Sequence, residues 1–384
     1  MKREASPVRP QLAQEFAEIG FRGAFDDGAP YWDESVRYVF RLDQIEDDIE
    51  KAAEELHALC LSLVGDVVRS ERALRRLCIP EHAWDLIAES WRRRDPSLYG
   101  RFDFAYDGRS PPRLLEYNAD TPTALYDAAV VQWRWLEQLI ASRALPDDAD
   151  QFTSAHEKLI ARFGEIGGGE FLHLACMAKD SDSAGTLAYL ADCAGQAGLP
   201  VATLDMGDIG LARDRFVDPR GREIKRLFKL YPWEWMFADD FGRSAAMRWT
   251  LFVEPPWKMI LQCKGALALL WEKAPHHPNL LECYFEAERE AALLTRYARK
   301  PLYSREGADI ELKGDGEVLR GVSDNYGAEG FVRQALRPLP EFDGRYPVVG
   351  AWIVGDEAAG MGVREDATPL TGVRARFVPH AILG

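Results

Sequence analysis

The 384 residues are 47% hydrophobic and 11% aromatic, which is enough to bury a large core or two to three linked cores. A formal net charge of -15 repels phosphate backbones, so nucleic acid is disfavoured as the main ligand and cationic partners such as amines are favoured. No apolar run approaches the roughly 18 residues of a membrane helix, and the opening MKREASPVRP lacks the apolar stretch of a signal peptide, so we expect a cytoplasmic protein without a membrane partner.

The first part of the chain predicts helices and a β-hairpin. Apolar residues recur at helical spacing from Leu42 to Leu63, and residues 125–142 repeat that pattern. Between them, RFDFAYDGRSPPRLLEYNAD (101–120) alternates aromatic with charged residues, turns at Asp107-Gly108 and continues into a second extended run. We therefore expect two paired antiparallel strands after a helical segment.

The later segments complete the prediction of an α+β fold. Residues 170–206 have the strand, helix, strand pattern of a small α/β unit. The glycines at 167–169 precede its first strand, so a dinucleotide-binding fingerprint is not supported. Strand-like runs at 330–339, 346–355 and 358–366 alternate with turns and indicate a mixed ending.

Glu116 and Asn118 make one face of the second hairpin strand polar. They lie two residues apart, so a pleated strand places them on the same face, and Leu115 and Tyr117 are expected to supply the core from the other. A half-buried strand normally keeps one face for the core, so the polar face needs a separate purpose.

Arg101 and Asp103 share a face of the first hairpin strand in the same way. If the strands pair in the right register, these side chains converge with Glu116 and Asn118. Two carboxylates and an amide oxygen are hard ligands suited to Mg²⁺, and the arginine would face phosphates bound to that metal. A solvated hairpin with one charged face is the simpler alternative, and a glycosidase carboxylate pair is a second one that leaves Arg101 and Asn118 unexplained.

Two lysines are candidates for holding a nucleotide, since the chain has no G-x-x-x-x-G-K-[ST] sequence and an ordinary P-loop is excluded. Lys264 lies between a strand-like and a helix-like run. Lys300 precedes a proline and a short loop with Glu306 and Gly307, which we expect to be a mobile lid with few apolar anchors. On pattern alone, either lysine is more often a surface charge with a buried stem.

Four longer motifs resemble the glutathionylspermidine synthase family: LEYNADTPT, EPPWKMI, KPLYSREG and AWIVGDEAAGMGVRED. The resemblance extends from about Arg101 to the final FVPH. It implies an ATP-grasp fold with a small inserted α/β subdomain, and a ligase that uses ATP and Mg²⁺ to join a carboxylic acid to an amine. One catalytic unit over residues 1–384 would comprise a helical part with the metal-binding hairpin (1–165), a substrate-side α/β unit (166–245) and an ATP-binding part (246–384).

Site residues follow from the same resemblance, position by position. Asp103, Glu116 and Asn118 match the family's metal ligands. Arg101 matches its transition-state arginine and Arg364 a second arginine at the phosphates, so these two are the expected catalytic residues. Arg101 and Asp103 are also expected to contact the nucleotide.

The remaining matched positions concern nucleotide and acid. Lys264 and Lys300 match ATP-contacting lysines, and Glu306 with Gly307 matches the phosphate loop. The acid substrate is expected at the two threonines that stand where the family has serines, Thr121 and Thr123.

The substrates implied are a small carboxylic acid, such as a peptide or a glutathione-like molecule, and an amine. Nothing upstream resembles the amidase half of the bifunctional members. MAKDSDSAG offers Asp180 and Asp182 where polyamine-recognising acidic residues would be expected, without a paired match. A nucleotide-binding regulatory protein on the same scaffold, without ligase activity, is the alternative.

Overall fold

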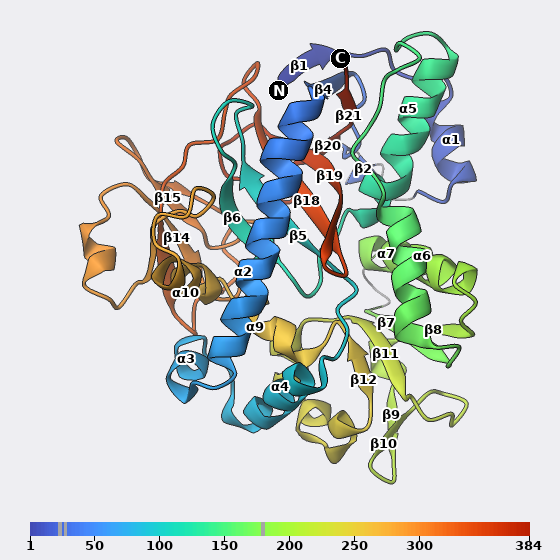
Figure 1. The fold of residues 1–384 in the computed structure, drawn as a ribbon, viewed down its shortest axis with the longest axis vertical. Helices are drawn as coiled ribbons and strands as arrows, with labels where there is room; N and C mark the ends of the chain where they lie inside the picture. Colours follow the sequence, from blue (N-terminus) through green and yellow to red (C-terminus); the bar gives the residue numbers. More distant parts are fainter. Residues whose placement is uncertain (22–24, 27–28, 178–180) are drawn as a thin grey trace.

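The computed structural model describes residues 1–21, 25–26, 29–177 and 181–384, and a five-stranded antiparallel sheet lies at its centre (Figure 1). The strand order is β20-β19-β18-β5-β6. The bounds are Arg376–Val378, Glu357–Asp366, Tyr346–Val354, Tyr99–Ala105 and Arg113–Asn118. The predicted hairpin is β5–β6, and two of the predicted late strands are β18 and β19, so the alternating patterns identified these strands correctly.

Helix α2 (Lys51–Val67) covers one face of the central sheet. It continues the π-helical turn η1 (Gln44–Glu50), so the predicted helical stretch from Leu42 to Leu63 is confirmed. The sheet face beneath α2 is apolar: the rings of Phe102 and Tyr117 stack with centroids 3.9 Å apart. The opposite face is left for polar side chains.

A second sheet is fully parallel, with the order β12-β11-β7-β8. Its strands are Leu251–Val253, Arg226–Leu230, Leu172–Cys176 and Val201–Asp205. Helix α7 (Ser181–Gln196) connects β7 to β8 and packs on α6 (Ala155–Gly167), which confirms the predicted α/β unit. The hairpin of β9 (Gly210–Ala212) and β10 (Arg215–Val217) follows, and β12 lies beyond residue 245.

A third sheet, antiparallel, lies on the other side of the centre (left in Figure 1). Its order is β13-β17-β14-β15-β16, with bounds Cys283–Phe285, Phe331–Ala335, Tyr297–Pro301, Glu311–Lys313 and Leu319–Arg320. Helix α10 (Gly265–Lys273) packs on β13 and β17. The expected α+β class is therefore confirmed.

The segment before Lys264 was expected to be strand-like, and that expectation is wrong. Residues Pro256–Lys258 form the 3-10 turn η6, and Met259–Gln262 form helix α9. A short apolar run does not distinguish a buried strand from a buried helix, and Pro256 suits the first turn of a helix.

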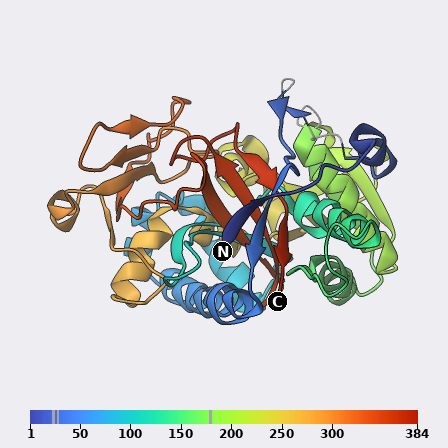
Figure 2. The same cartoon turned by 90° about the horizontal axis from the view of Figure 1, so that it is seen from above.

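The two ends of the chain meet in a small sheet, where β1 (Lys2–Ala5) and β21 (His380–Ile382) both pair with β4 (Val36–Phe40) (Figure 2). A two-stranded ribbon joins β2 (Phe25–Asp26) to β3 (Ala29–Pro30). The remaining α-helices are α1 (Leu12–Glu18), α3 (Glu71–Arg76), α4 (Glu81–Arg93), α5 (Gln132–Ala141) and α8 (Trp233–Ala238). None of the helices in the described part of the chain is long and apolar enough to cross a membrane.

A buried ion pair joins the central sheet to the parallel one. Asp120, just after β6, lies 2.6 Å from the Nζ of Lys229 on β11, and both side chains are fully buried. The other carboxylate oxygen of Asp120 accepts the backbone N–H of Trp233 at 2.8 Å, at the start of α8. The backbone between the two sheets is thereby fixed, because both oxygens of Asp120 and the ammonium group of Lys229 have partners.

Candidate active site

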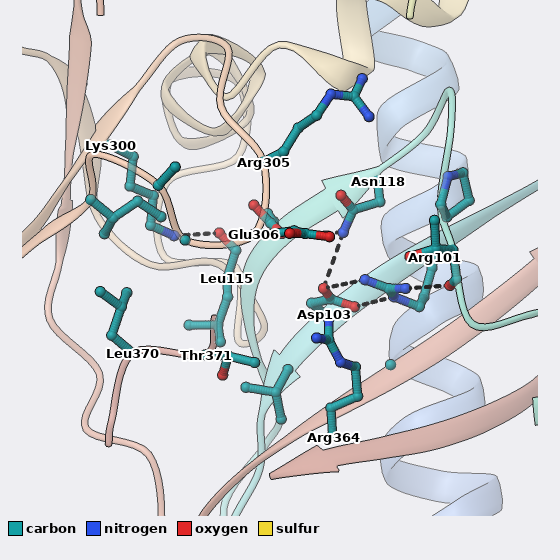
Figure 3. Close-up of a pocket in the computed structure, with 18 of the residues that line it drawn as sticks. Arg101, Asp103, Leu115, Asn118, Lys300, Arg305, Glu306, Arg364, Leu370 and Thr371 are labelled. Atoms are coloured by element: carbon teal, nitrogen blue, oxygen red, sulfur yellow. Dashed lines mark hydrogen bonds and ion pairs between the residues drawn. The ribbon is translucent and has the colours of Figure 1, made fainter. Parts of the chain in front are cut away.

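A cavity of about 600 Å³ lies where the three sheets meet. Its walls come from the polar face of the central sheet, from β14 and the loops of the third sheet, and from the end of β11 with α8. Figure 3 shows side chains from these separate segments pointing into the same space. All the predicted site residues line this cavity except Lys264, which contacts one of them from behind.

The β5–β6 register brings the four polar hairpin residues together. Arg101 is opposite Asn118, and Asp103 is opposite Glu116. Both Nε and Nη2 of Arg101 bind the carboxylate of Asp103, at 2.6 and 2.9 Å, and Nη1 donates to the backbone carbonyl of Thr123 at 2.7 Å. A bidentate pair of this kind fixes the orientation of both side chains.

Leu115 departs from the expected alternation. The pairing shifts after Asp103 so that Phe104 is opposite Leu114, which leaves Leu115 as the extra residue of a β-bulge. Tyr117 faces the core as predicted, but Leu115 lines the cavity, and the prediction for that residue is wrong. The bulge has a use, because the freed carbonyl of Leu115 accepts Lys300 Nζ at 2.7 Å.

Glu116 lies between two buried lysines. Lys264 Nζ is 3.2 Å from its carboxylate, and Lys300 also binds Gln334 Oε1 at 2.7 Å. Burial would raise the pKa of Glu116, but the charges of Lys264 and Lys300 outweigh it and lower that pKa to about 2. Burial lowers the pKa of Lys300 to about 8, even though Glu116 acts in the opposite direction.

Arg364 projects from β19 into the same cavity (Figure 3). It forms no ion pair with a described carboxylate; its Nη2 donates to the carbonyl of Gly372 at 3.2 Å, and its buried Nε has no partner in the described chain. Its neighbour Glu365 binds Arg3 on the opposite face of the strand instead. Arg364 is therefore a cation available to an anionic ligand.

The loop after Lys300 has more anchors than we expected. Leu302, Tyr303 and Ala308 are buried, and the hydroxyl of Tyr303 donates to the carbonyl of Leu77 at 2.9 Å. Gly307 has a φ of 73°, and a Cβ there would lie 2.6 Å from the carbonyl oxygen of Thr371. Glycine is needed at this position, and the segment that faces solvent is limited to the middle of the loop.

Arg305 and Gln262 are cavity residues to which the sequence gave no site role, although Arg305 belongs to the loop expected to form a lid. Arg305 Nη1 donates to the hydroxyl of Thr121 at 3.0 Å. Gln262 Oε1 accepts the backbone N–H groups of both Ala119 and Asp120 at 3.0 Å, which holds the segment after the metal candidates. These partners are more than 140 residues apart in the chain, so spacing gives no signal for them.

The donor set on the hairpin fits Mg²⁺. Asp103, Glu116 and Asn118 offer only oxygen ligands of the hard type, and the described residues contain no cluster of three or more His, Cys, Asp or Glu that would suggest another metal site. The Nδ2 of Asn118 donates to both carboxylates, at 3.0 and 3.2 Å. A half-turn of that amide presents its oxygen at the same point.

The acidic stretch around residue 180 lies at the limit of the described structure. Asp180 is outside the described residues, and the side chain of Asp182 is not described either. Their expected relation to an amine stays a prediction.

Sequence comparison gives one family and several relatives. The profile described as "Glutathionylspermidine synthase preATP-grasp" matches residues 3–383. A protein of Haemophilus influenzae named "Putative acid–amine ligase" is 41% identical over 396 residues, with 99% of each chain covered. Trypanothione synthetase of Crithidia fasciculata and the bifunctional glutathionylspermidine synthetase/amidase of Escherichia coli are each 27% identical, and the chain spans 53% and 56% of their lengths.

A solved structure shares the fold. The apo form of a glutathione synthetase-like effector from Globodera pallida aligns with a TM-score of 0.55 at 11% identity, covering 99% of this chain and all of the other. At this identity the likeness concerns the architecture alone.

Proposed function

Because the chain belongs to the glutathionylspermidine synthase family, we propose that it is an ATP- and Mg²⁺-dependent ligase of the ATP-grasp type that joins a carboxylic acid to an amine. One observation carries the proposal: the cavity places two carboxylates and an amide beside Arg101, Lys300 and Arg364. Oxygen ligands for a divalent cation next to converging cations are what phosphoryl transfer requires.

The hairpin would hold the metal and the third sheet the nucleotide. Asp103, Glu116 and Asn118 would hold Mg²⁺, which when bound supplies charge neutralisation at phosphate oxygens. Lys300 would contact the phosphates from the opposite side. Lys264, expected as a second phosphate contact, does not line the cavity and would act by holding Glu116 in place from behind. Glu306 and Gly307 would form the loop over them, and apolar cavity residues of the third sheet, such as Leu312 and Leu336, would border the base.

The chemistry would run through an acyl phosphate. Thr121 and Thr123 would position the acid so that its carboxylate attacks the γ-phosphoryl group, with ADP as the leaving group. The neutral amine would then attack the acyl carbon, phosphate would leave, and the proton lost by the nitrogen would pass to the leaving phosphate or to water. Arg101 and Arg364 would offset the charge that develops in both transfers, and no protein nucleophile is needed.

A protein that only binds a nucleotide for regulation would not require the three candidate metal ligands and both arginines. Retention of all three candidate metal ligands together with both arginines supports turnover over binding alone. The acid is proposed to be a peptide-like or glutathione-like molecule, as in the named activities of the relatives.

The test is ATP turnover with and without mixtures of amino acids, γ-glutamyl peptides and amines, with products identified by mass spectrometry. We expect phosphate release to depend on Mg²⁺ and to rise only when an acid and an amine are both present. Nucleotide binding without any stimulated turnover across the mixtures would favour the regulatory alternative.

A further inference from the structure

One wall of the cavity is aromatic and partly open. Trp235 on α8 keeps 42% of its surface exposed although it lines the cavity, and its ring meets that of Tyr231 edge-on at 5.6 Å. A large indole left accessible inside a cavity is suited to contact with a ligand, because its face is both apolar and electron-rich.

This wall already holds a cation. The guanidinium of Arg305 lies over the Trp235 ring, 5.2 Å from its centroid, and its Nη2 is 3.4 Å from Glu234 Oε1. The same guanidinium binds the hydroxyl of Thr121. The guanidinium group of Arg305 therefore links Glu234 and Trp235 to Thr121, the residue proposed to contact the acid substrate.

The contacts at this place are incomplete. Glu234 Oε2 and Arg305 Nε are both buried, and neither has a hydrogen-bond partner in the described part of the chain. The 3.4 Å contact between the two side chains is long for a charged hydrogen bond. Burial raises the pKa of Glu234, although Arg305 opposes this shift, so the carboxylate is short of stabilising donors.

Building on the acid–amine ligase function, we propose that Glu234 and Trp235 form the subsite for the ammonium group of the amine substrate, and that Arg305 occupies this subsite until the amine arrives. An ammonium group brings three donors, which would satisfy the carboxylate that Arg305 leaves half-partnered. Its alkyl stem would lie along Trp235 and Tyr231.

The charges of the niche select an amine over an acid. A carboxylate and the face of an indole both attract a cation and repel an anion. The position also suits the reaction, because one guanidinium, that of Arg305, spans Glu234 and Thr121, so an amine at Glu234 lies close to the proposed acid. The ammonium group must lose a proton before its nitrogen attacks the acyl carbon, and the Glu234 carboxylate that it contacts would accept this proton.

The test is calorimetric binding of n-butylamine, 1,4-diaminobutane and phenethylamine to the whole protein saturated with Mg²⁺ and a non-hydrolysable ATP analogue. At least one of these amines should bind the wild type. Glu234→Gln should weaken that binding about tenfold or more, Trp235→Ala should weaken it several-fold, and Trp235→Phe should largely retain it. Asp240→Asn, which neutralises an exposed carboxylate nearby, is the matched control and should bind like the wild type.

Nucleotide affinity should be unchanged in all four variants, which separates amine recognition from a general loss of structure. If Glu234→Gln fails to fold, the two Trp235 variants still decide the question. The proposal would be overturned if Glu234→Gln or Trp235→Ala bound amines with wild-type affinity. It would also be overturned if none of the three amines bound the wild-type protein.

Hydroxylamine separates this inference from the ligase proposal, since it traps an acyl phosphate as a hydroxamate without needing an amine subsite. With ATP and the acid mixture, Glu234→Gln should lose far less of its hydroxamate formation than of its amine-dependent product. If the wild type forms no hydroxamate but binds amines as described, the ligase proposal fails and the subsite stands. Parallel loss of hydroxamate in Glu234→Gln would count against the subsite.

Discussion

Glu116 and Asp120 are carboxylates four residues apart on the same alternating segment, yet their surroundings differ. Glu116 keeps 28% of its side chain exposed to the cavity, and one of its two lysine neighbours, Lys300, also faces that space. Asp120 is fully buried, and both of its oxygens are taken by Lys229 and by the N–H of Trp233. A carboxylate that opens onto the cavity can exchange its partners for a ligand, whereas a fully buried carboxylate with both oxygens satisfied holds structure.

Substitution of the first carboxylate should give the largest effect on activity. Glu116→Ala removes a candidate metal ligand, so we expect Mg²⁺-dependent ATP turnover to fall by about three orders of magnitude or more, ~4 kcal/mol of transition-state stabilisation. Phosphate-release kinetics on a preparation with a native circular dichroism spectrum will measure it. Wild-type turnover in that variant would remove Glu116 from the metal site.

Substitution of the second carboxylate should act on stability. Asp120→Ala leaves Lys229 buried without its counter-ion, which should lower the free energy of unfolding by about 3–5 kcal/mol. Denaturant titration compares it with Glu116→Ala, whose midpoint should stay closer to the wild type. If both variants lose stability equally, the distinction between the two carboxylates is wrong.

Substitution of Arg101 or Arg364 should lower the turnover rate much more than the affinity for Mg-ATP. Arg101→Ala and Arg364→Ala are expected to keep Mg-ATP binding within about tenfold, ~1.4 kcal/mol, and to lose turnover by about two orders of magnitude or more. The reason is that their proposed contacts with the transferring phosphoryl group form mainly in the transition state. Calorimetry with phosphate-release kinetics measures both quantities. Affinity that collapses in step with rate would make them ordinary ground-state ligands.

The smallest expected effect is a pH dependence of nucleotide affinity that comes from Lys300. Its pKa in the unliganded protein is lowered to about 8, so its charge is present below that pH and is lost as the pH rises through it. Bound phosphates favour the charged form, so nucleotide affinity should fall by up to about tenfold between pH 7 and 9. Lys300→Met should bind nucleotide more weakly and without this pH dependence, and an equal slope in both proteins would assign the titration to another group.

Glu116 and Asp120 also show which features of the hairpin the sequence pattern predicts and which it does not. Strict alternation of polar and apolar residues identified the hairpin and its polar face, because a period of two residues is typical of a β-strand with one buried face. The same alternation does not distinguish Glu116 from Asp120, since the difference depends on Lys229, which is 109 residues away in the chain. Leu115 was misassigned because a bulge leaves no mark on the pattern.

Long-range partners account for the rest of what the sequence did not predict. Arg305 meets Glu234 across 71 residues, and Lys300 meets the carbonyl of Leu115 across 185. The family resemblance predicted Lys264 and Lys300 as nucleotide contacts, whereas the local pattern alone favoured surface charges. That alternative is wrong, because both lysines are buried. What each residue binds is not tested by the fold, so those roles stay proposals.

The topology of the central sheet also delays its formation during synthesis of the chain. Its central strand β18 pairs with β5, and the facing residues are separated by roughly 250 positions in the chain. At the usual 5–20 residues per second, the ribosome needs roughly 12–50 s to deliver β18 after β5 has been made. During that interval β5 has an unpaired edge, which is a template for association with other chains. We therefore expect nascent chains that end before β18 to need chaperone protection and to aggregate without it.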